Sequence, residues 1–447
     1  MSNEKGKLGL LNSTTILIGG MIGSAIFSLS GLTIMNAGPA AIISWIVAGI
    51  ILIAYGLQTA ELSTMYPQSG GIFVFPAKAL GKTEKAGKVW GWISAWAYLF
   101  GCIAGAAFSA MYVGIYLSVS FPALGSIGTI IAIATVILCG ILNIIEISAM
   151  GKINTVLTIG LAVSMIIFVA TGLGSGKWDG SALMPFFTQG LEGTWGFMGA
   201  IPIAMVAFGA IVAVSFMVGE IKNPKKTVPQ SMIISMSIVL VLYILMIVTT
   251  LGLVTSSFLQ QNPGMAYIPM YAAVFTTLSN LPWLGYVVTI AAVLALITTI
   301  LVVMALAGRA LQASAAAGIL PKGLGKISEK TNTPVNAQLL VILVVGIIAA
   351  FPSATNFIVN FGSLCNAIVV AIICLTVIAA RKKNPEITDK FTAPGGNVLP
   401  IITFIAIIVA YIPGILSGGY MLWVWTAAYF VLGMIIYFIS QMKKKSA

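Results

Sequence analysis

Glycine and serine residues in the first long apolar segment could form a binding site from backbone groups. Residues 18–27 read Ile-Gly-Gly-Met-Ile-Gly-Ser-Ala-Ile-Phe. A helix in a membrane must satisfy its own backbone polar groups, so such a run is costly unless the backbone has another partner. If the helix opens between Gly23 and Ala25, one half presents N–H groups and a positive dipole end, and the other presents carbonyls. These groups suit the carboxylate and the ammonium of a small zwitterion. Alternatively, the glycines only allow two helices to pack closely.

The composition restricts the class of protein. Charged residues make up 7% of the 447 residues and hydrophobic residues 59%, which excludes an ordinary soluble domain and indicates a polytopic membrane protein. In a membrane protein, a net charge of +12 is expected from basic loops on one side of the membrane. We therefore expect no nucleic-acid partner. The chain has no histidine, and its four cysteines lie in apolar segments without C-x-x-C spacing. We therefore expect no metal site, no cofactor and no enzymatic activity.

Apolar segments of roughly 20 residues predict twelve membrane spans with all-α structure. Their expected ranges are 9–33, 39–65, 89–119, 125–145, 152–173, 195–220, 230–254, 282–311, 335–351, 355–380, 398–415 and 421–441. With the N-terminus inside, all of the 22 basic residues except Lys177 fall in the loops and ends on the inner side. This separation predicts that both termini are cytoplasmic.

The sixth segment is the second place where the helical pattern fails. It contains Gly196, Gly199, Pro202 and Gly209. Interrupted helices five segments apart are typical of transporters built from an inverted repeat, with the substrate between the two breaks. We expect a first repeat over 1–173, a second over 174–380, and two additional spans over 381–447.

These features resemble the amino acid-polyamine-organocation (APC) transporters. Residues 22–27 are similar to the Ile-Gly-Ser-Gly-Ile-Phe signature of that family. Further similar stretches follow spans two, six and eight, and they lie at 61–71, 220–229, 308–309, 318–321 and 333–334. The resemblance covers spans one to ten. It implies a five-plus-five inverted repeat like that of the bacterial sodium-coupled leucine transporter, with broken spans one and six and alternating access.

The resemblance also implies a substrate site. The α-carboxylate would bind the amides of Gly23, Ser24 and Ala25. The α-ammonium would bind carbonyls near Ile22, Phe208 and Ile211. Tyr98 aligns with a tyrosine that closes over substrate in relatives, and Phe208 could cap the pocket from outside. Ordinary packing is the alternative for both aromatic residues.

The sequence departs from the family pattern in three ways. Ala25 stands where a second glycine is usual, which restricts the backbone. Leu161 stands where many relatives have a lysine in span five. Ala106 and Val212 stand where relatives that carry arginine or polyamines have polar or acidic groups, so a buried cationic side chain would lack a counter-charge.

The remaining polar residues suggest gates and ion sites. Glu61 and Glu220 lie at cytoplasmic span ends, where we expect ion pairs with Arg309 or nearby lysines that could form an inner gate. Because no acidic residue falls clearly at mid-depth, the pocket is expected to be uncharged. Thr298 and Thr299 match positions that hold Na⁺ in sodium-coupled relatives, although threonines in membrane helices usually bond their own backbone.

The sequence thus predicts a secondary transporter of small neutral L-amino acids in the plasma membrane, working by exchange or with H⁺. Its pocket would be lined by small residues such as Ala25, Ala106, Gly209 and Ala210. A basic amino acid or polyamine exchanger and a sodium-coupled symporter remain alternatives. Lipid and the amino acid substrate are the expected partners, and the chain could be a monomer or a homodimer.

Overall fold

The computed structural model describes residues 8–445 except 69, 146, 188, 332, 417 and 418. Lys5 and Lys7, used above to predict topology, lie outside the described residues. The side chains of 147–155, 216, 414–416 and 443–445 are also outside them, which removes Lys152 and the three C-terminal lysines from that argument.

The described chain is helical, as the sequence predicts. Its first part forms α1 (Leu10–Met21), α2 (Ser24–Ala37), α3 (Ala41–Met65), α4 (Gly71–Ala79), α5 (Glu84–Ser120), α6 (Gly128–Ile145) and α7 (Ile147–Gly174). Its second part forms α8 (Gly196–Met205), the 3₁₀ helix η5 (Val206–Val212), α9 (Ala213–Phe216), α10 (Pro224–Leu253), α11 (Ser256–Gln261), α12 (Pro269–Thr276), α13 (Pro282–Ala316), α14 (Val335–Ala349), α15 (Thr355–Lys383), α16 (Val398–Leu416) and α17 (Tyr420–Lys445).

Local residue chemistry explains several helix ends. Gly38 ends α2 with φ of 61°, a left-handed angle that glycine adopts at little cost. Pro224 occupies the first position of α10, where its missing N–H is not needed, and Asn223 before it has φ of 47°. The Thr83 hydroxyl accepts a hydrogen bond from the Ala86 amide and caps α5.

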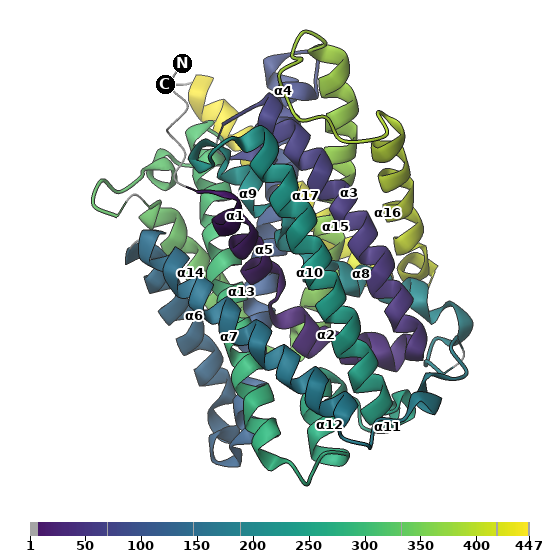
Figure 1. Cartoon of the computed structure of the whole chain (residues 1–447). Coiled ribbons are helices and arrows are strands. Elements are labelled where there is room, and N and C mark those ends of the chain that lie inside the picture. Colours follow the sequence, from purple (N-terminus) through teal and green to yellow (C-terminus); the bar gives the residue numbers. More distant parts are fainter. Residues whose placement is uncertain are drawn as a thin grey trace.

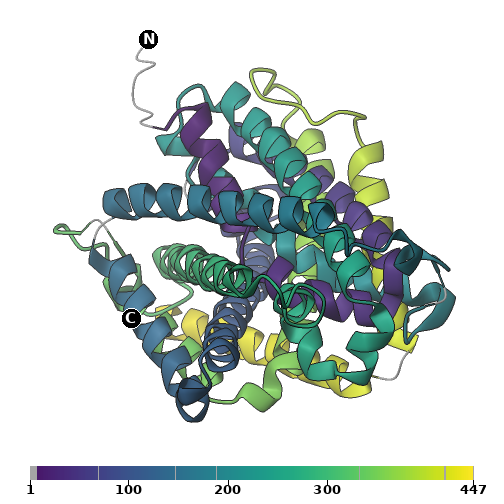
Figure 2. The same ribbon diagram turned by 60° about the horizontal axis from the view of Figure 1, so that its bottom comes forward.

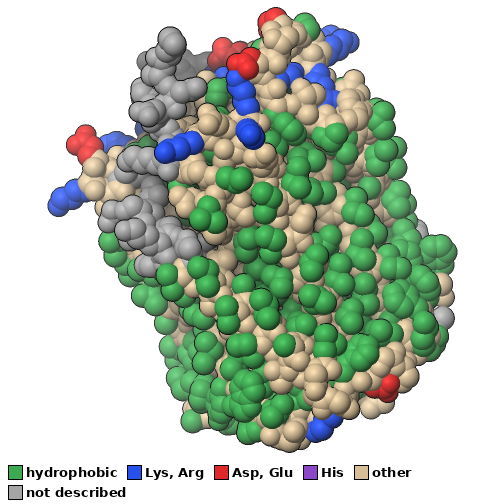
Figure 3. All heavy atoms as spheres, in the orientation of Figure 1, with side chains coloured by type: hydrophobic (Ala, Val, Ile, Leu, Met, Phe, Trp, Pro, Cys, Tyr) green, Lys and Arg blue, Asp and Glu red, His purple; other side chains and the backbone are tan. Residues whose placement is uncertain are grey.

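Length and apolar composition identify nine helical stretches among the described residues that could cross a membrane. One of them, Ser24–Met65, contains both α2 and α3. Three shorter apolar helices accompany them, over Leu10–Met21, Val335–Ala349 and Val398–Pro413. The face in Figure 3 has a broad apolar middle, and most charged side chains gather at the end of the bundle where α4 lies in Figure 1. This surface suits a protein embedded in lipid.

Two long helices form the centre of the bundle. α5 and α13 pack against each other extensively, and Figure 2 shows both nearly end-on in the middle of the molecule. The short helices α1 and α2 lie in the interior beside α10, α13 and α8 (Figure 1). Leu8 is held near the end of the sixth segment, because Leu8 and Ile221 form an isolated parallel β-bridge.

Candidate functional site

The first apolar segment is broken at Ile22 and Gly23. α1 ends at Met21, Ile22 has a ψ of 81°, and Gly23 is extended with φ of −128° and ψ of −153°. α2 then begins at Ser24, so the opening lies slightly before the expected position between Gly23 and Ala25. The Ile22 amide donates to the Ile18 carbonyl at 2.7 Å, and the Gly23 amide donates to the Met21 carbonyl at the same distance. The amides of the first turn of α2 therefore face the break at the positive end of that helix.

Thr299 of α13 approaches the break so closely that residue 23 must be a glycine. A Cβ on Gly23 would lie 1.8 Å from the Thr299 Oγ1. This hydroxyl accepts a hydrogen bond from the Ser24 amide at 3.1 Å and donates one to the Ala295 carbonyl at 3.0 Å. Ala25 is already inside α2, so its methyl group is compatible with the opened backbone. Thr298 also donates to the Ala295 carbonyl, at 2.9 Å.

Three further hydroxyl groups hold the two half-helices in place. Tyr243 of α10 donates to the carbonyl of Met21, the last residue of α1. Tyr116 of α5 donates to the Phe27 carbonyl at 2.5 Å. Ser109 donates to the Ser24 hydroxyl at 2.9 Å. The break is thus fixed by side chains from α5, α10 and α13.

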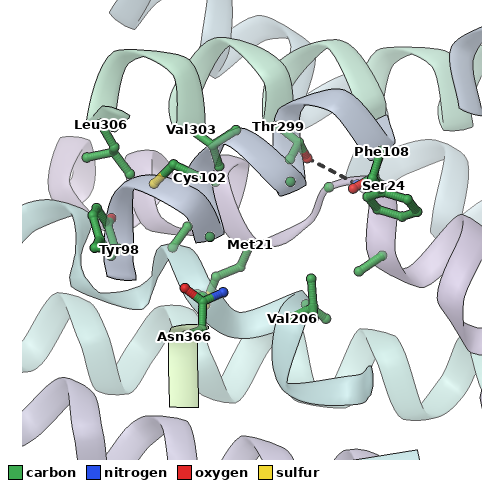
Figure 4. A pocket seen from close by; sticks show the side chains of 18 residues that line it. Met21, Ser24, Tyr98, Cys102, Phe108, Val206, Thr299, Val303, Leu306 and Asn366 are labelled. Atoms are coloured by element: carbon green, nitrogen blue, oxygen red, sulfur yellow. Dashed lines mark hydrogen bonds between the residues drawn. The ribbon is translucent and has the colours of Figure 1, made fainter. Parts of the chain in front are cut away.

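A cavity of about 60 Å³ lies at the break. Its lining residues, some of which are labelled in Figure 4, are Gly20, Met21, Gly23, Ser24, Ala25, Tyr98, Gly101, Cys102, Gly105, Phe108, Val206, Ala207, Gly209, Ala210, Thr299, Val303, Leu306 and Asn366. Among these described residues there is no acidic or basic side chain. A water molecule needs about 10–15 Å³ measured in this way, so the space admits only a few water-sized groups. The lining thus offers a solute only backbone groups and neutral side chains.

The sixth segment tightens into a 3₁₀ helix beside the break. α8 ends at Met205, and η5 carries the chain past the cavity, where Gly209 and Ala210 contribute to the lining. A Cβ on Gly20 would lie 2.9 Å from the Ala210 Cβ, so the small residues bring α1 and η5 together. A Cβ on Gly209 would meet nothing within 4 Å, which places open space next to this residue.

Some of the expected substrate residues line the cavity and others do not. Gly23, Ser24, Ala25, Tyr98, Gly209, Ala210 and Thr299 lie together around the cavity. The buried residues Ile22, Ala106, Phe208 and Ile211 are outside its lining, and so is Thr298.

The Phe208 ring does not cap the cavity. It packs against Trp45 and Tyr243, with ring centroids 6.1 Å and 5.3 Å away. The expectation of an outer cap is therefore corrected. Ile211 packs against Gly56 of α3. A Cβ added to Gly56 would lie 2.9 Å from the Ile211 Cγ1. In both cases the side chain turns toward the interior of the bundle because apolar and aromatic partners are available there.

Sequence reasoning missed several lining residues, of which Asn366 of α15 is the most polar. Figure 4 shows its amide across the cavity from the Ser24 and Thr299 pair. The signal that could have found it is an amide in the middle of an apolar segment, since polar groups in spans usually face the bundle interior. Gly101, Cys102, Gly105 and Phe108 gave no such signal, because their types are common in any membrane helix.

The buried carboxylate of Glu61 has a partner other than the one expected. Arg381 of α15 donates to both carboxylate oxygens, at 2.8 Å from Nε and 2.6 Å from Nη2. The Ala393 amide donates to the same carboxylate at 2.8 Å, and the Lys390 Nζ lies 4.0 Å from it. We expected Arg309 or nearby lysines as the partners of Glu61. Arg381 takes the place of Arg309, because α15 and the loop after it reach the carboxylate, and Lys390 agrees with the lysine alternative.

Glu220 is exposed at the end of the sixth segment. Its backbone carbonyl accepts a hydrogen bond from the Leu8 amide at 3.0 Å. Neither its side chain nor that of Arg309 forms an ion pair within the part of the chain that the structure describes.

Comparison with known proteins now identifies the family. Residues 8–441 match the amino acid permease family, so the match covers nearly the whole chain. The chain belongs to the amino acid permease family. The permease is therefore a multi-pass membrane transporter for an amino acid substrate, and it is not an enzyme.

Named relatives of this permease carry different substrates. The branched-chain amino acid permease BcaP of Bacillus subtilis (strain 168) is 26% identical over 458 residues, which cover 98% of this chain and 94% of the relative. The serine/threonine exchanger SteT of the same organism is 28% identical over 245 residues, covering 54% of this chain and 53% of the relative. Cationic amino acid transporter 7, chloroplastic, of Arabidopsis thaliana is 25% identical over 400 residues, which cover 84% of this chain and 65% of the relative. Membership of the family alone does not identify the substrate of this permease.

Proposed function

We propose that the protein is a secondary active transporter of small neutral L-amino acids that works by alternating access. The observation that carries this proposal is the break at Ile22 and Gly23, which opens onto a cavity of about 60 Å³. The α-carboxylate binds the amides of Ser24 and Ala25 at the positive end of α2, where an anion is favoured. The α-ammonium binds the carbonyls at the end of α1 and in η5.

The uncharged lining supports a neutral substrate over a cationic one. A lysine, arginine or polyamine side chain would have to leave water without an acidic partner among the lining residues. Although small residues such as Gly101, Gly105 and Gly209 line the cavity, its volume of about 60 Å³ leaves room for a modest side chain only. The alternative, a basic amino acid or polyamine exchanger, would need a pocket that differs from this one in charge.

Exchange or proton coupling is the proposed mode of transport. Leu161 is buried and cannot carry a proton. Sodium coupling is the second candidate, because the Thr299 hydroxyl lies at the break and Thr298 is its neighbour. Both hydroxyls already donate to the Ala295 carbonyl, as threonines in membrane helices commonly bond their own backbone.

We also propose the membrane topology. Twelve spans, with the first and sixth interrupted and both termini cytoplasmic, explain why the basic residues outside the spans gather on one side. The ion pair of Glu61 with Arg381 then lies near the cytoplasmic side and joins the second span to the tenth. Such a pair could act as part of an inner gate.

Uptake into proteoliposomes tests the proposal. Labelled neutral, cationic and acidic amino acids and putrescine are offered with and without unlabelled internal substrate, under imposed Na⁺ and pH gradients. We expect saturable uptake of small neutral amino acids that responds to internal substrate or to the pH gradient. Uptake of arginine or putrescine alone would contradict the choice of substrate, and accumulation driven by Na⁺ alone would contradict the choice of coupling.

A further inference from the structure

Asn366 presents an uncommitted amide to the cavity. The residue lies near the middle of α15, its side chain is half-buried, and it contributes to the cavity lining. In the part of the chain that the structure describes, no residue forms a hydrogen bond with this amide, and its polar atoms remain accessible from the cavity. Because the amide lines the cavity and bonds to no protein group, it is available to a ligand there.

The opposing helix is shaped to receive the Asn366 side chain. A Cβ on Gly101 of α5 would lie 2.2 Å from the Asn366 Oδ1, so only a glycine leaves space for the amide there. One turn further along α5, Gly105 has no atom nearer than 4.0 Å to the position of a Cβ. α5 therefore gives Asn366 a fixed place and keeps the adjacent part of the cavity open.

Asn366 lines a second cavity as well. This smaller cavity of about 20 Å³ shares Tyr98, Val206, Gly209 and Asn366 with the main one. Its volume is close to that of a single water molecule. The carboxylate end of the main cavity, at Ser24 and Thr299, lies across from Asn366 in Figure 4. A substrate held by its carboxylate at the break would point its side chain toward this amide.

We propose that Asn366 selects substrates whose short side chain carries a hydroxyl group. This inference rests on the proposed function, since it names the class within the small neutral amino acids. An amide both donates and accepts, so it can satisfy a hydroxyl completely. An aliphatic side chain of the same size leaves the amide without a partner, which is the kind of mismatch that polar sites reject strongly. The cavity volume restricts the choice to side chains near the size of serine.

Isosteric substrate pairs isolate this effect. Serine and 2-aminobutyrate have the same number of heavy atoms, as do threonine and valine, and the members of each pair differ by a hydroxyl in place of a methyl. We would measure inhibition of labelled alanine uptake by each compound in proteoliposomes. For the unmodified protein we expect serine to inhibit about tenfold more strongly than 2-aminobutyrate. Substitution Asn366→Leu should reduce this ratio to about twofold or less, whatever its effect on the rate of alanine uptake.

A matched variant controls for effects on the helix. Asn360→Leu makes the same change on α15 at an exposed position and should leave the ratio unchanged. If Asn366→Leu fails to fold, the ratio of inhibition by serine to inhibition by 2-aminobutyrate is compared between Asn366→Ala and the unmodified protein. A ratio near one in the unmodified protein, or one that survives loss of the amide, overturns the assignment of Asn366. If no small neutral amino acid is transported, the proposed function itself fails.

Discussion

The Ser24 amide donates a hydrogen bond of 3.1 Å to the Thr299 hydroxyl, which lies 275 positions later in the chain. The hydroxyl thus occupies an amide at the positive end of α2, where a carboxylate would bind more strongly than a neutral oxygen. If the α-carboxylate binds here as proposed, Thr299 is a placeholder that keeps this N–H satisfied in the absence of substrate. The position of the Thr299 hydroxyl also explains why residue 23 must be glycine.

Gly23→Ala should strongly destabilise the protein. The new Cβ would lie 1.8 Å from the Thr299 Oγ1, so α1, α2 or α13 must shift, and we expect a loss of about 2–4 kcal/mol. Thermal unfolding of the purified protein in detergent measures this loss. The double variant Gly23→Ala with Thr299→Ala removes the hydroxyl and should recover part of the stability. An unchanged unfolding midpoint in the single variant would contradict the close approach.

Thr299→Val should reveal the placeholder role. The substitution keeps the shape of the side chain but leaves the Ser24 amide without its partner, which costs about 1–3 kcal/mol in the absence of substrate. Saturating substrate should shrink this deficit, because the carboxylate then takes the amide. Thr299→Ser keeps the hydroxyl and serves as the control. A deficit that is the same with and without substrate would argue that the carboxylate binds elsewhere.

Glu61→Gln should be far more harmful than Arg309→Gln. Glu61 is fully buried and accepts two hydrogen bonds from Arg381, so its loss leaves a partly buried cation unpaired at a cost of about 3–5 kcal/mol. Arg309 has no ion pair among the described residues, and its neutralisation should shift stability by less than about 1 kcal/mol. Unfolding midpoints in detergent compare the two variants. Equal effects would return Arg309 to consideration as the partner of Glu61.

Gly209→Ala should narrow the cavity without harming the fold. The added methyl group meets no atom within 4 Å, so it projects into open space beside the cavity. We expect inhibition of alanine uptake by threonine to weaken about tenfold relative to inhibition by serine, because the larger side chain loses the space. Gly346→Ala in α14 also meets nothing within 4 Å and is remote from the lining, so it is the matched control. Equal inhibition profiles in both variants would contradict the location of the site.

Asp179, in the loop before α8, should contribute a small pH-dependent stabilisation. Hydrogen bonds from the Ser181 hydroxyl and amide hold the pKa of its carboxyl below the ordinary value. Since the folded-state pKa is depressed, the contribution is present above the unfolded pKa of about 3.9 and is lost as the pH falls through the folded pKa. Unfolding midpoints of Asp179→Asn and the unmodified protein should therefore differ at neutral pH and converge in acid. A difference that is constant with pH would rule out this carboxylate as its source.

Local patterns were sufficient for the helical fold and for the broken backbone. The glycines of residues 18–27 and the apolar length of the segments are properties of neighbouring residues, so they place the break within two residues of Gly23. The family resemblance was carried by short motifs of the same local kind, and it agrees with the family match over residues 8–441.

Only the tertiary structure decided which distant side chains meet. Glu61 pairs with Arg381 rather than Arg309, Phe208 turns to Trp45 and Tyr243, and Asn366 faces the cavity. The sequence determined the helices and the opening between α1 and α2, because backbone hydrogen bonding and burial act over a few residues. The partners depend on helix rotation and crossing, which are fixed by packing over the whole bundle.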